Sequence, residues 1–472
     1  MGQEEKNNKL TRRAFLKHGT GVGVAGAALG PMVLNLAACS DSKATDESMT
    51  PGMPGGAPAG DTTGMQPGGV AAAGSGSTPV SGAGGSPPGT DPMTGAGGAD
   101  STPVAASAIA AGAVLFGLYT GNGTEAMTMA APRLDFSWLK AGDSVLIKVA
   151  SNSGNPHPSV TSPAGVRGMV AHLKSLGAGK VIVADQAGVE WVRNSAAGRF
   201  SSTKERWMTN GLIEQDTDVH FFDDQTFDAG YFKATPPMPN NWPRGFYLPN
   251  IIKEVDHILY MPRIGAHTIA GLTLAHKSAI GWLRDDSRHD LHNDAAKFYE
   301  KFTEVNYAAE IKDRFRMAVT VSEKVLLHGG PDVGTQYTMS PVLVIASTSM
   351  ANHDAVASSV LVTLNKSVPV APGGMMYSAG TAGFTNTFFA GGTGVGGTTM
   401  AAGPWKDAGS VASAHVAHPF EMGITKDRAT SHGWELTGGK PASIDVTADG
   451  ETMDAALMTG LTSHGEGMYK FG

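Results

Sequence analysis

The feature that most constrains the fold is one strand–helix–strand unit in the middle third of the chain. The run Ser144–Ala150 is almost entirely apolar and predicts a buried strand. Ser162 and Pro163 then provide a helix N-cap and a first-turn proline, and apolar residues follow at helical spacing. Val181–Asp185 is a second apolar run, which ends in an acid. Two buried strands joined by a helix through short connections form a right-handed parallel crossover, which predicts an α/β fold.

Further apolar runs continue this alternation along the chain. Strands are expected at 114–119, 219–222, 257–261, 317–321 and 342–346, and helices at 202–210, 295–316 and 353–364. The alternation predicts a mostly parallel open sheet with helices on both faces, in Rossmann-like layers.

The region before these runs has a composition that opposes folding. Residues 51–100 contain 16 Gly and 8 Pro, and no Lys, Arg, Leu, Ile or aromatic residue. Such a segment buries too little apolar surface to offset its ordering entropy. We therefore expect a disordered Gly/Pro/Ser/Thr-rich linker over 40–106. A single α/β domain is expected over 107–472, with an irregular Gly-rich insertion at 372–403.

The amino terminus carries two export signals in succession. Thr11–Lys17 is a twin-arginine motif, and the Gly/Ala-rich stretch 19–38 is too weakly apolar for a stable membrane span. The stretch ends in Leu-Ala-Ala-Cys, which resembles a bacterial lipobox with Cys39 as the lipidated residue. We expect 1–39 to be a twin-arginine lipoprotein signal peptide. The expected partners are the twin-arginine export machinery and a membrane reached through the lipid, with the domain facing the periplasm or the cell exterior.

Charge and cysteine content exclude several classes of protein. The chain carries 35 Lys and Arg against 42 Asp and Glu, and no run of five basic residues, so nucleic acid is not an expected partner. Cys39 is the sole cysteine, which excludes disulfides, Cys-ligated zinc and an iron–sulfur cluster held by this chain alone. The sequence also lacks the GxSxG and HExxH motifs of common hydrolases.

The densest cluster of polar residues follows the expected strand at 257–261. It includes the ionisable residues His267, His276, Lys277, Arg288, His289 and His292. In open α/β sheets, ligands bind beyond the carboxyl ends of strands, so this cluster is a candidate ligand site. His289 and His292 are three residues apart and would share one face of a helix, which is compatible with metal ligation. The alternative is that these histidines are capping or surface groups.

Three other strand ends carry candidate site residues. Lys148 lies in a buried strand and needs a partner, for which Asp185 is the nearest candidate. Lys148 is then either one half of a structural ion pair or a lysine of the ligand site. Gly330 and Gly334 belong to a turn whose backbone amides would approach an anion closely, or which is simply tight. Asp354 is a candidate catalytic acid, with a favourable first-turn acid as the alternative.

Four segments, taken in order, carry a family resemblance. They are DSVLIKVASN, HILYMPRIGAHTIAGLTLAHKS, LLHGGPDVG and VLVIASTSMANHDAVASSVL. Over about 140–440 the chain resembles the domain of unknown function 362 family. The positions that match the family pattern are Lys148, His267, Lys277, Gly330, Pro331, Gly334 and Asp354. Arg263 and Gly265 stand where the family has lysines, which weakens any anion site built from those lysines.

The resemblance implies a ligand site without naming an activity. Many relatives carry a ferredoxin-like iron–sulfur module, which this chain cannot hold with one cysteine. The family also has a distant likeness, at the level of fold alone, to nickel-dependent lactate racemase.

We expect an exported, lipid-anchored α/β protein that binds a small anionic ligand or a His-ligated metal at a strand-end cleft. Candidate residues, by role, are His267, Lys277 and Asp354 for catalysis; Lys148, Asp185, Arg288, Gly330 and Gly334 for ligand binding; and His289 and His292 for a metal. Two function classes stay open. One is an enzyme that uses a metal or a Lys/His acid–base pair, and the other is a non-catalytic binding or scaffolding lipoprotein. The ionisable residues at strand ends favour the enzyme.

Overall fold

The computed structural model describes part of the chain. The described residues are 107–152, 154–188, 192–195, 198–212, 217–267, 270–292, 294–327, 331–332, 334–367 and 423–472. The expected signal peptide, its Cys39, the linker and the Gly-rich insertion lie outside them. Within the described part, no helix has both the length and the apolar character that a membrane crossing requires.

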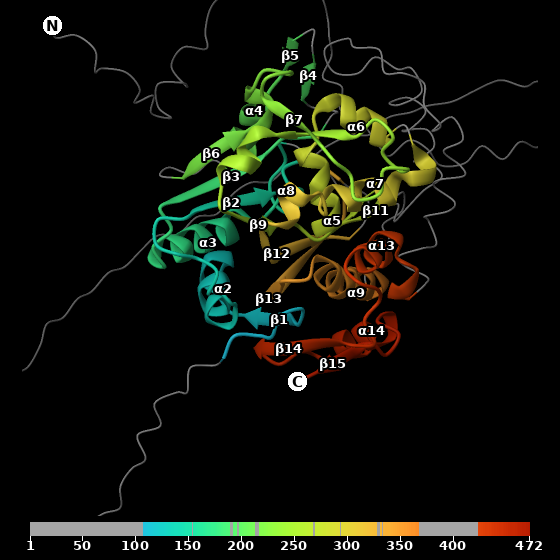
Figure 1. The fold of residues 1–472 in the computed structure, drawn as a ribbon. Helices are drawn as coiled ribbons and strands as arrows, with labels where there is room; N and C mark the ends of the chain where they lie inside the picture. The colour runs from blue at the N-terminus through green and yellow to red at the C-terminus, as the bar shows by residue number, and fades with distance from the viewer. Residues whose placement is uncertain are drawn as a thin grey trace, which may run out of the picture. The chain divides into compact units, whose positions relative to one another are not determined.

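One mixed sheet of eleven strands organises the described residues (Figure 1). The strand order is β15-β14-β1-β13-β12-β9-β2-β3-β6, and the short strands β10 and β11 join it beside β12. The bounds of these strands are β1 (Val114–Tyr119), β2 (Ser144–Val149), β3 (Lys180–Asp185), β6 (Asp218–Phe221), β9 (His257–Met261), β10 (Gly265–His267), β11 (Gly271–Thr273), β12 (Phe315–Leu326), β13 (Gln336–Ser347), β14 (Ile444–Gly450) and β15 (Tyr469–Phe471). Two separate hairpins pair β4 (Arg193–Ser195) with β5 (Gly198–Phe200) and β7 (Tyr231–Ala234) with β8 (Phe246–Pro249).

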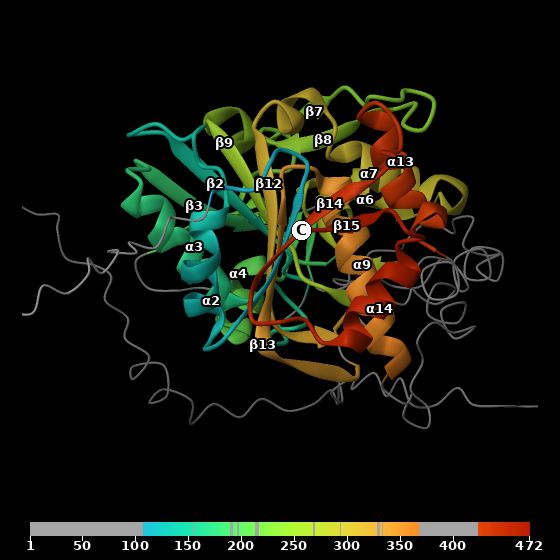
Figure 2. The same cartoon turned by 90° about the horizontal axis from the view of Figure 1, so that it is seen from below.

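Helices cover both faces of the sheet. On one face lie α2 (Gly123–Ala130), α3 (Pro163–Ser175) and α4 (Thr203–Asn210). On the other face lie α5 (Ala275–Ser278), α6 (Asp285–His292), α7 (Phe298–Val305), α8 (Ala309–Lys312), α9 (Met350–Ser367), α13 (Arg428–Leu436) and α14 (Ala455–His464). Figure 2 shows the sheet between α2 and α3 on one side and α9 and α14 on the other. The described residues also form short 3₁₀ turns, which are η1 (Ala131–Arg133), η2 (Phe222–Asp224), η3 (Asn250–Glu254), η4 (Ala279–Trp282), η5 (Ala295–Lys297) and η8 (Ile424–Lys426).

Alternation along the strands explains why the sheet is covered on both faces. In β2, Val145 and Ile147 pack with the α3 side, whereas Leu146 packs with the opposite layer. All three side chains are fully buried. Because successive side chains of a strand point to opposite faces, a strand that is apolar throughout needs cover on both.

The predicted crossover and fold class are confirmed. Ser162 caps α3 through a hydrogen bond from the backbone N–H of Gly165, and β2 and β3 pair in parallel on either side of that helix in the chain. The strands β9, β2, β3 and β6 are parallel to one another, and β12 is parallel to β9. β13 is antiparallel to both β12 and β1, and the short β11 is antiparallel to β10. We call the end of the sheet where β2, β3 and β9 finish the carboxyl edge, and the end where β1 and β12 begin the amino edge.

One expected element is wrong. Residues 295–316 do not form a single helix, since η5, α7 and α8 follow one another and β12 begins at Phe315. The interruption lies at Asn306, whose side-chain amide donates to the carbonyl oxygens of Phe302 and Thr303 and so ends α7.

Candidate functional site

A buried ion pair lies at the carboxyl edge. Lys148 Nζ is 2.6 Å from Asp185 Oδ1, and it also donates to the carbonyl oxygens of Val149 and Ser278. Asp185 Oδ2 accepts from the backbone N–H and the hydroxyl of Ser151. Burial lowers the pKa of Lys148, and the carboxylate of Asp185 opposes that shift. The three ammonium hydrogens thus have three acceptors, which gives this lysine the contacts of a structural group.

Gly281 covers the same ion pair. A Cβ at this position would collide with Asp185 Oδ1 and lie 2.6 Å from Lys148 Nζ. The turn η4 therefore approaches the pair only because it carries no side chain there.

Arg288 lies on α6, in the layer of helices that covers the sheet, and its side chain is only 1% exposed. Its Nε donates to Leu283 O, Nη1 donates to Ala187 O, and Nη2 donates to the carbonyl oxygens of Gln186 and Gly281. Four backbone carbonyls thus take most of the guanidinium donors and tie α6 to the loop after β3. The predicted ligand-binding role of Arg288 stays a prediction, and these contacts give the side chain a structural one.

Five basic side chains from four segments gather at the carboxyl edge, and we call them the basic cluster: Arg263, His267, Lys277, His289 and His292. Burial, followed by the charges of Lys277 and Arg263, holds the pKa of His267 well below its ordinary value. Burial lowers the pKa of His292 to about 3, and Lys277 and His289 add to that shift. Both imidazoles are therefore neutral at neutral pH.

Two hydrogen bonds fix which ring nitrogen of each neutral imidazole carries the proton. His267 Nδ1 accepts from the backbone N–H of Ala270, so the neutral ring carries its proton on Nε2. His292 Nδ1 faces Arg288 O at 2.7 Å and donates to it. His267 is thus held as a hydrogen-bond donor, like the cations around it.

The turn after β12 is joined to this edge. Arg263 donates to the carbonyl oxygens of Pro158 and Pro331, and Asn152 donates to the carboxylate of Asp332. Gly330 lies outside the described residues, and Gly334 is exposed. Their predicted role in anion binding stays a prediction.

Metal ligation also stays a prediction. His289 and His292 lie three residues apart on α6, as expected from the sequence. Within the described ranges, no three His, Cys, Asp or Glu side chains are grouped so that they could hold a metal ion.

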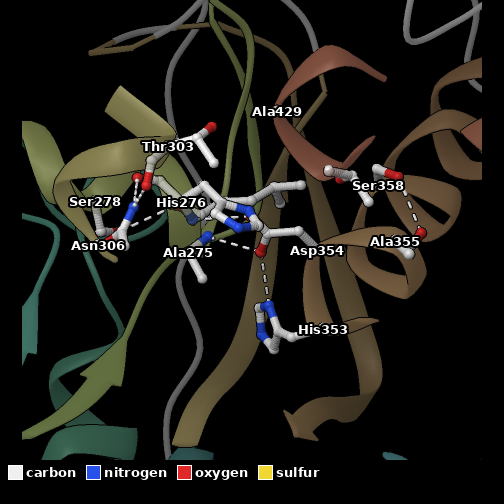
Figure 3. Close-up of polar contacts among 12 residues, drawn as sticks. Ala275, His276, Ser278, Thr303, Asn306, His353, Asp354, Ala355, Ser358 and Ala429 are labelled. Carbon is white, nitrogen blue, oxygen red and sulfur yellow. Dashed lines mark hydrogen bonds and ion pairs between the residues drawn. The ribbon is translucent and has the colours of Figure 1, made fainter. Parts of the chain in front are cut away.

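Asp354 joins a different set of partners. It accepts from the backbone N–H groups of Ala275 and His276, each at 2.9 Å, and from Nδ1 of His276 and of His353, each at 2.8 Å (Figure 3). Burial would raise the pKa of Asp354, but the two histidines hold it below its ordinary value. His353 Nε2 in turn lies 2.9 Å from the hydroxyl of Thr320. The carboxylate therefore fixes two imidazoles: His276, which belongs to the polar cluster that the sequence indicates, and His353, which the sequence did not single out.

Helix α5 lies between the two groups of residues. His276 contacts Asp354, whereas the neighbouring Lys277 acts on His267 and His292. His267 and Lys277 thus belong to the basic cluster, and Asp354 is bound to His276; the single cleft expected for these three residues stays a prediction.

Comparison with known proteins identifies a family and no activity. Residues 145–359 match the family model described as "Domain of unknown function (DUF362)". The structure of the lactate racemase apoprotein from Thermoanaerobacterium thermosaccharolyticum is similar with a TM-score of 0.35 and 14% sequence identity. The likeness covers 52% of this chain and 56% of that chain, so this chain spans little more than half of that protein. The search of curated proteins found no match.

Proposed function

Because residues 145–359 make this chain a member of the DUF362 family, whose description assigns no activity, we propose a function from the geometry: the α/β domain binds a small anionic molecule at the basic cluster. The observation that carries the proposal is the placement of His267: its buried ring is fixed by Ala270, and its pKa is lowered by burial first and then by the charges of Lys277 and Arg263. Their charges must therefore lie close to the imidazole.

The chemistry of the cluster favours binding over proton abstraction. Cations brought together at a partly buried site repel one another, and an anion among them relieves that repulsion. His267 adds a neutral N–H donor, because its Nδ1 is occupied by Ala270. An anion with several oxygens would accept from Lys277, Arg263 and His267 together.

We expect Lys277→Ala to weaken the binding of inorganic phosphate or citrate at least about tenfold, because a hydrogen bond to a charged group contributes ~1.5–3 kcal/mol. Isothermal titration calorimetry on the full chain measures this. The matched control is Lys470→Ala, which removes the same charge from an exposed position on β15. Equal affinity in Lys277→Ala and the parent protein would contradict the proposal, as would loss of affinity in Lys470→Ala alone.

The amino terminus supports a proposal about location. The twin-arginine motif at 11–17 and the lipobox ending at Cys39 stand in the order that exported lipoproteins use. We propose that the chain leaves the cytoplasm through the twin-arginine pathway and is anchored by a lipid on Cys39. The linker 40–106 would then tether the anion-binding domain to the outer face of a membrane.

The two signals are separable by mutation. Replacing both arginines, Arg12→Lys with Arg13→Lys, should leave unprocessed precursor in the cytoplasm, measured by fractionation and immunoblotting. Cys39→Ser should abolish labelling by a radioactive fatty acid while export continues. Export of the double lysine variant would refute the pathway, and labelling of Cys39→Ser would refute the anchor.

A further inference from the structure

An open cleft of about 490 Å³ lies at the amino edge of the sheet, away from the basic cluster. Gly112 just before β1, Phe315 at the start of β12 and Thr348 just after β13 all line it. Trp434 of α13 lines it as well. Its volume is in the range of small-molecule sites.

The side chain of Asn306 is fixed in the wall of this cleft by three hydrogen bonds. Asn306 is 3% exposed and lines the cleft, and its Nδ2 donates to the carbonyl oxygens of His276, Phe302 and Thr303. Those three acceptors fix which end of the amide is nitrogen. Among the described residues, Asn306 Oδ1 then has no hydrogen-bond donor. This oxygen is shielded from solvent, so it belongs to the wall of the cleft and not to its open surface.

A second polar group in the cleft is Tyr307, and a hydrogen-bonded chain holds its hydroxyl. His276 Nδ1 donates to Asp354, which leaves Nε2 as the acceptor of the ring. The Tyr307 hydroxyl lies 3.1 Å from that Nε2 and therefore donates to it. This leaves the lone pairs of the tyrosine oxygen for a ligand. Burial and the charge of Asp354 raise the pKa of Tyr307, which keeps the hydroxyl protonated.

The contact between the Tyr307 hydroxyl and His276 requires a glycine on α13. A Cβ at Gly433 would lie 2.5 Å from His276 Nε2 and 3.1 Å from the Tyr307 hydroxyl. The backbone at Gly433 is ordinary helix, so alanine is excluded there by the contact and not by the conformation.

We propose that this cleft is a second ligand site, which takes a small anion bearing hydroxyl groups, such as a sugar acid or a sugar phosphate. The Tyr307 oxygen accepts from a ligand hydroxyl. Lys312, exposed on the rim of the cleft, pairs with the anionic group. His276 and Asp354 are positioning residues, since they act on the ligand only through Tyr307.

The test measures the binding of gluconate and glucose 6-phosphate to the full chain by ligand-observed NMR and calorimetry. Tyr307→Phe, which keeps the ring, should weaken both about tenfold, the effect expected for the loss of one hydrogen bond at a buried site. Lys312→Gln should weaken both similarly, and glucose should bind more weakly than either anion. Gly433→Ala should reproduce the effect of Tyr307→Phe and also shift the imidazole ¹⁵N resonances of His276, a change that a general loss of stability would not produce.

Glu435→Ala is the matched control, because it alters the exposed face of the same helix. Retained affinity in Tyr307→Phe would overturn the proposal, and so would the absence of binding by either sugar anion at about 10 mM. If Lys277→Ala abolishes the binding of the sugar anions and Tyr307→Phe retains it, these anions bind at the basic cluster. That result would overturn the second site and leave the proposed function intact.

Discussion

Lys148→Met is expected to lower the free energy of unfolding by about 3–5 kcal/mol, because it leaves the carboxylate of Asp185 buried without its counter-charge. Among the described residues, the remaining donors to Asp185 are the backbone N–H and the hydroxyl of Ser151. Two carbonyl oxygens, of Val149 and Ser278, lose their donor as well. Urea denaturation followed by tryptophan fluorescence measures the change.

The double variant Lys148→Met with Asp185→Leu is the control for this experiment. It removes both charges at once, so most of the lost stability should return. Unchanged stability of Lys148→Met together with lost phosphate binding would show instead that Lys148 is a site lysine.

Arg288→Met should destabilise the domain by about 4 kcal/mol or more, because it removes the donor from four buried carbonyl oxygens at ~1 kcal/mol or more each. Arg288→Lys should recover little of this, since an ammonium group cannot reproduce the planar fork of the guanidinium. The urea midpoint of each variant gives the comparison.

An exposed arginine serves as the reference for Arg288. Arg244→Met, whose side chain is 76% exposed, should change stability by less than about 1 kcal/mol. A variant of Arg288 that is as stable as Arg244→Met but no longer binds phosphate would make it the ligand-binding residue that the sequence predicts.

Local pattern was enough to predict the first half of the sheet. The strands β2 and β3 are continuous apolar runs, and α3 has its cap, its first-turn proline and its periodicity within one stretch of sequence. The carboxyl-terminal elements were not predicted. In β14 only Ile444 and Val446 are fully buried, so its pattern is too short to distinguish it from a loop.

In the candidate site, too, contacts set by local sequence were predictable, and contacts between distant residues were not. The Lys148–Asp185 pair was predictable, because a lysine in a buried strand requires a partner and the adjacent strand ends in an acid. The contact of His276 with Asp354 joins residues 78 positions apart. It depends on how α9 packs against α5, which no spacing in the sequence specifies. Tyr307 was not predicted as a site residue for a related reason, because it lies at the break in an expected helix.

The position of β1 has a consequence for the order of events in synthesis. This strand, among the first of the described residues to be made, pairs on one side with β13 and on the other with β14. Leu115 is the partner of both Ala346 and Thr447, so its neighbours emerge from the ribosome hundreds of residues later. Until then both edges of β1 are open, and closing such long loops is slow. The described sheet can therefore be completed only after β14 has been translated, and the export route proposed above, which accepts folded cargo, would have to wait for that strand.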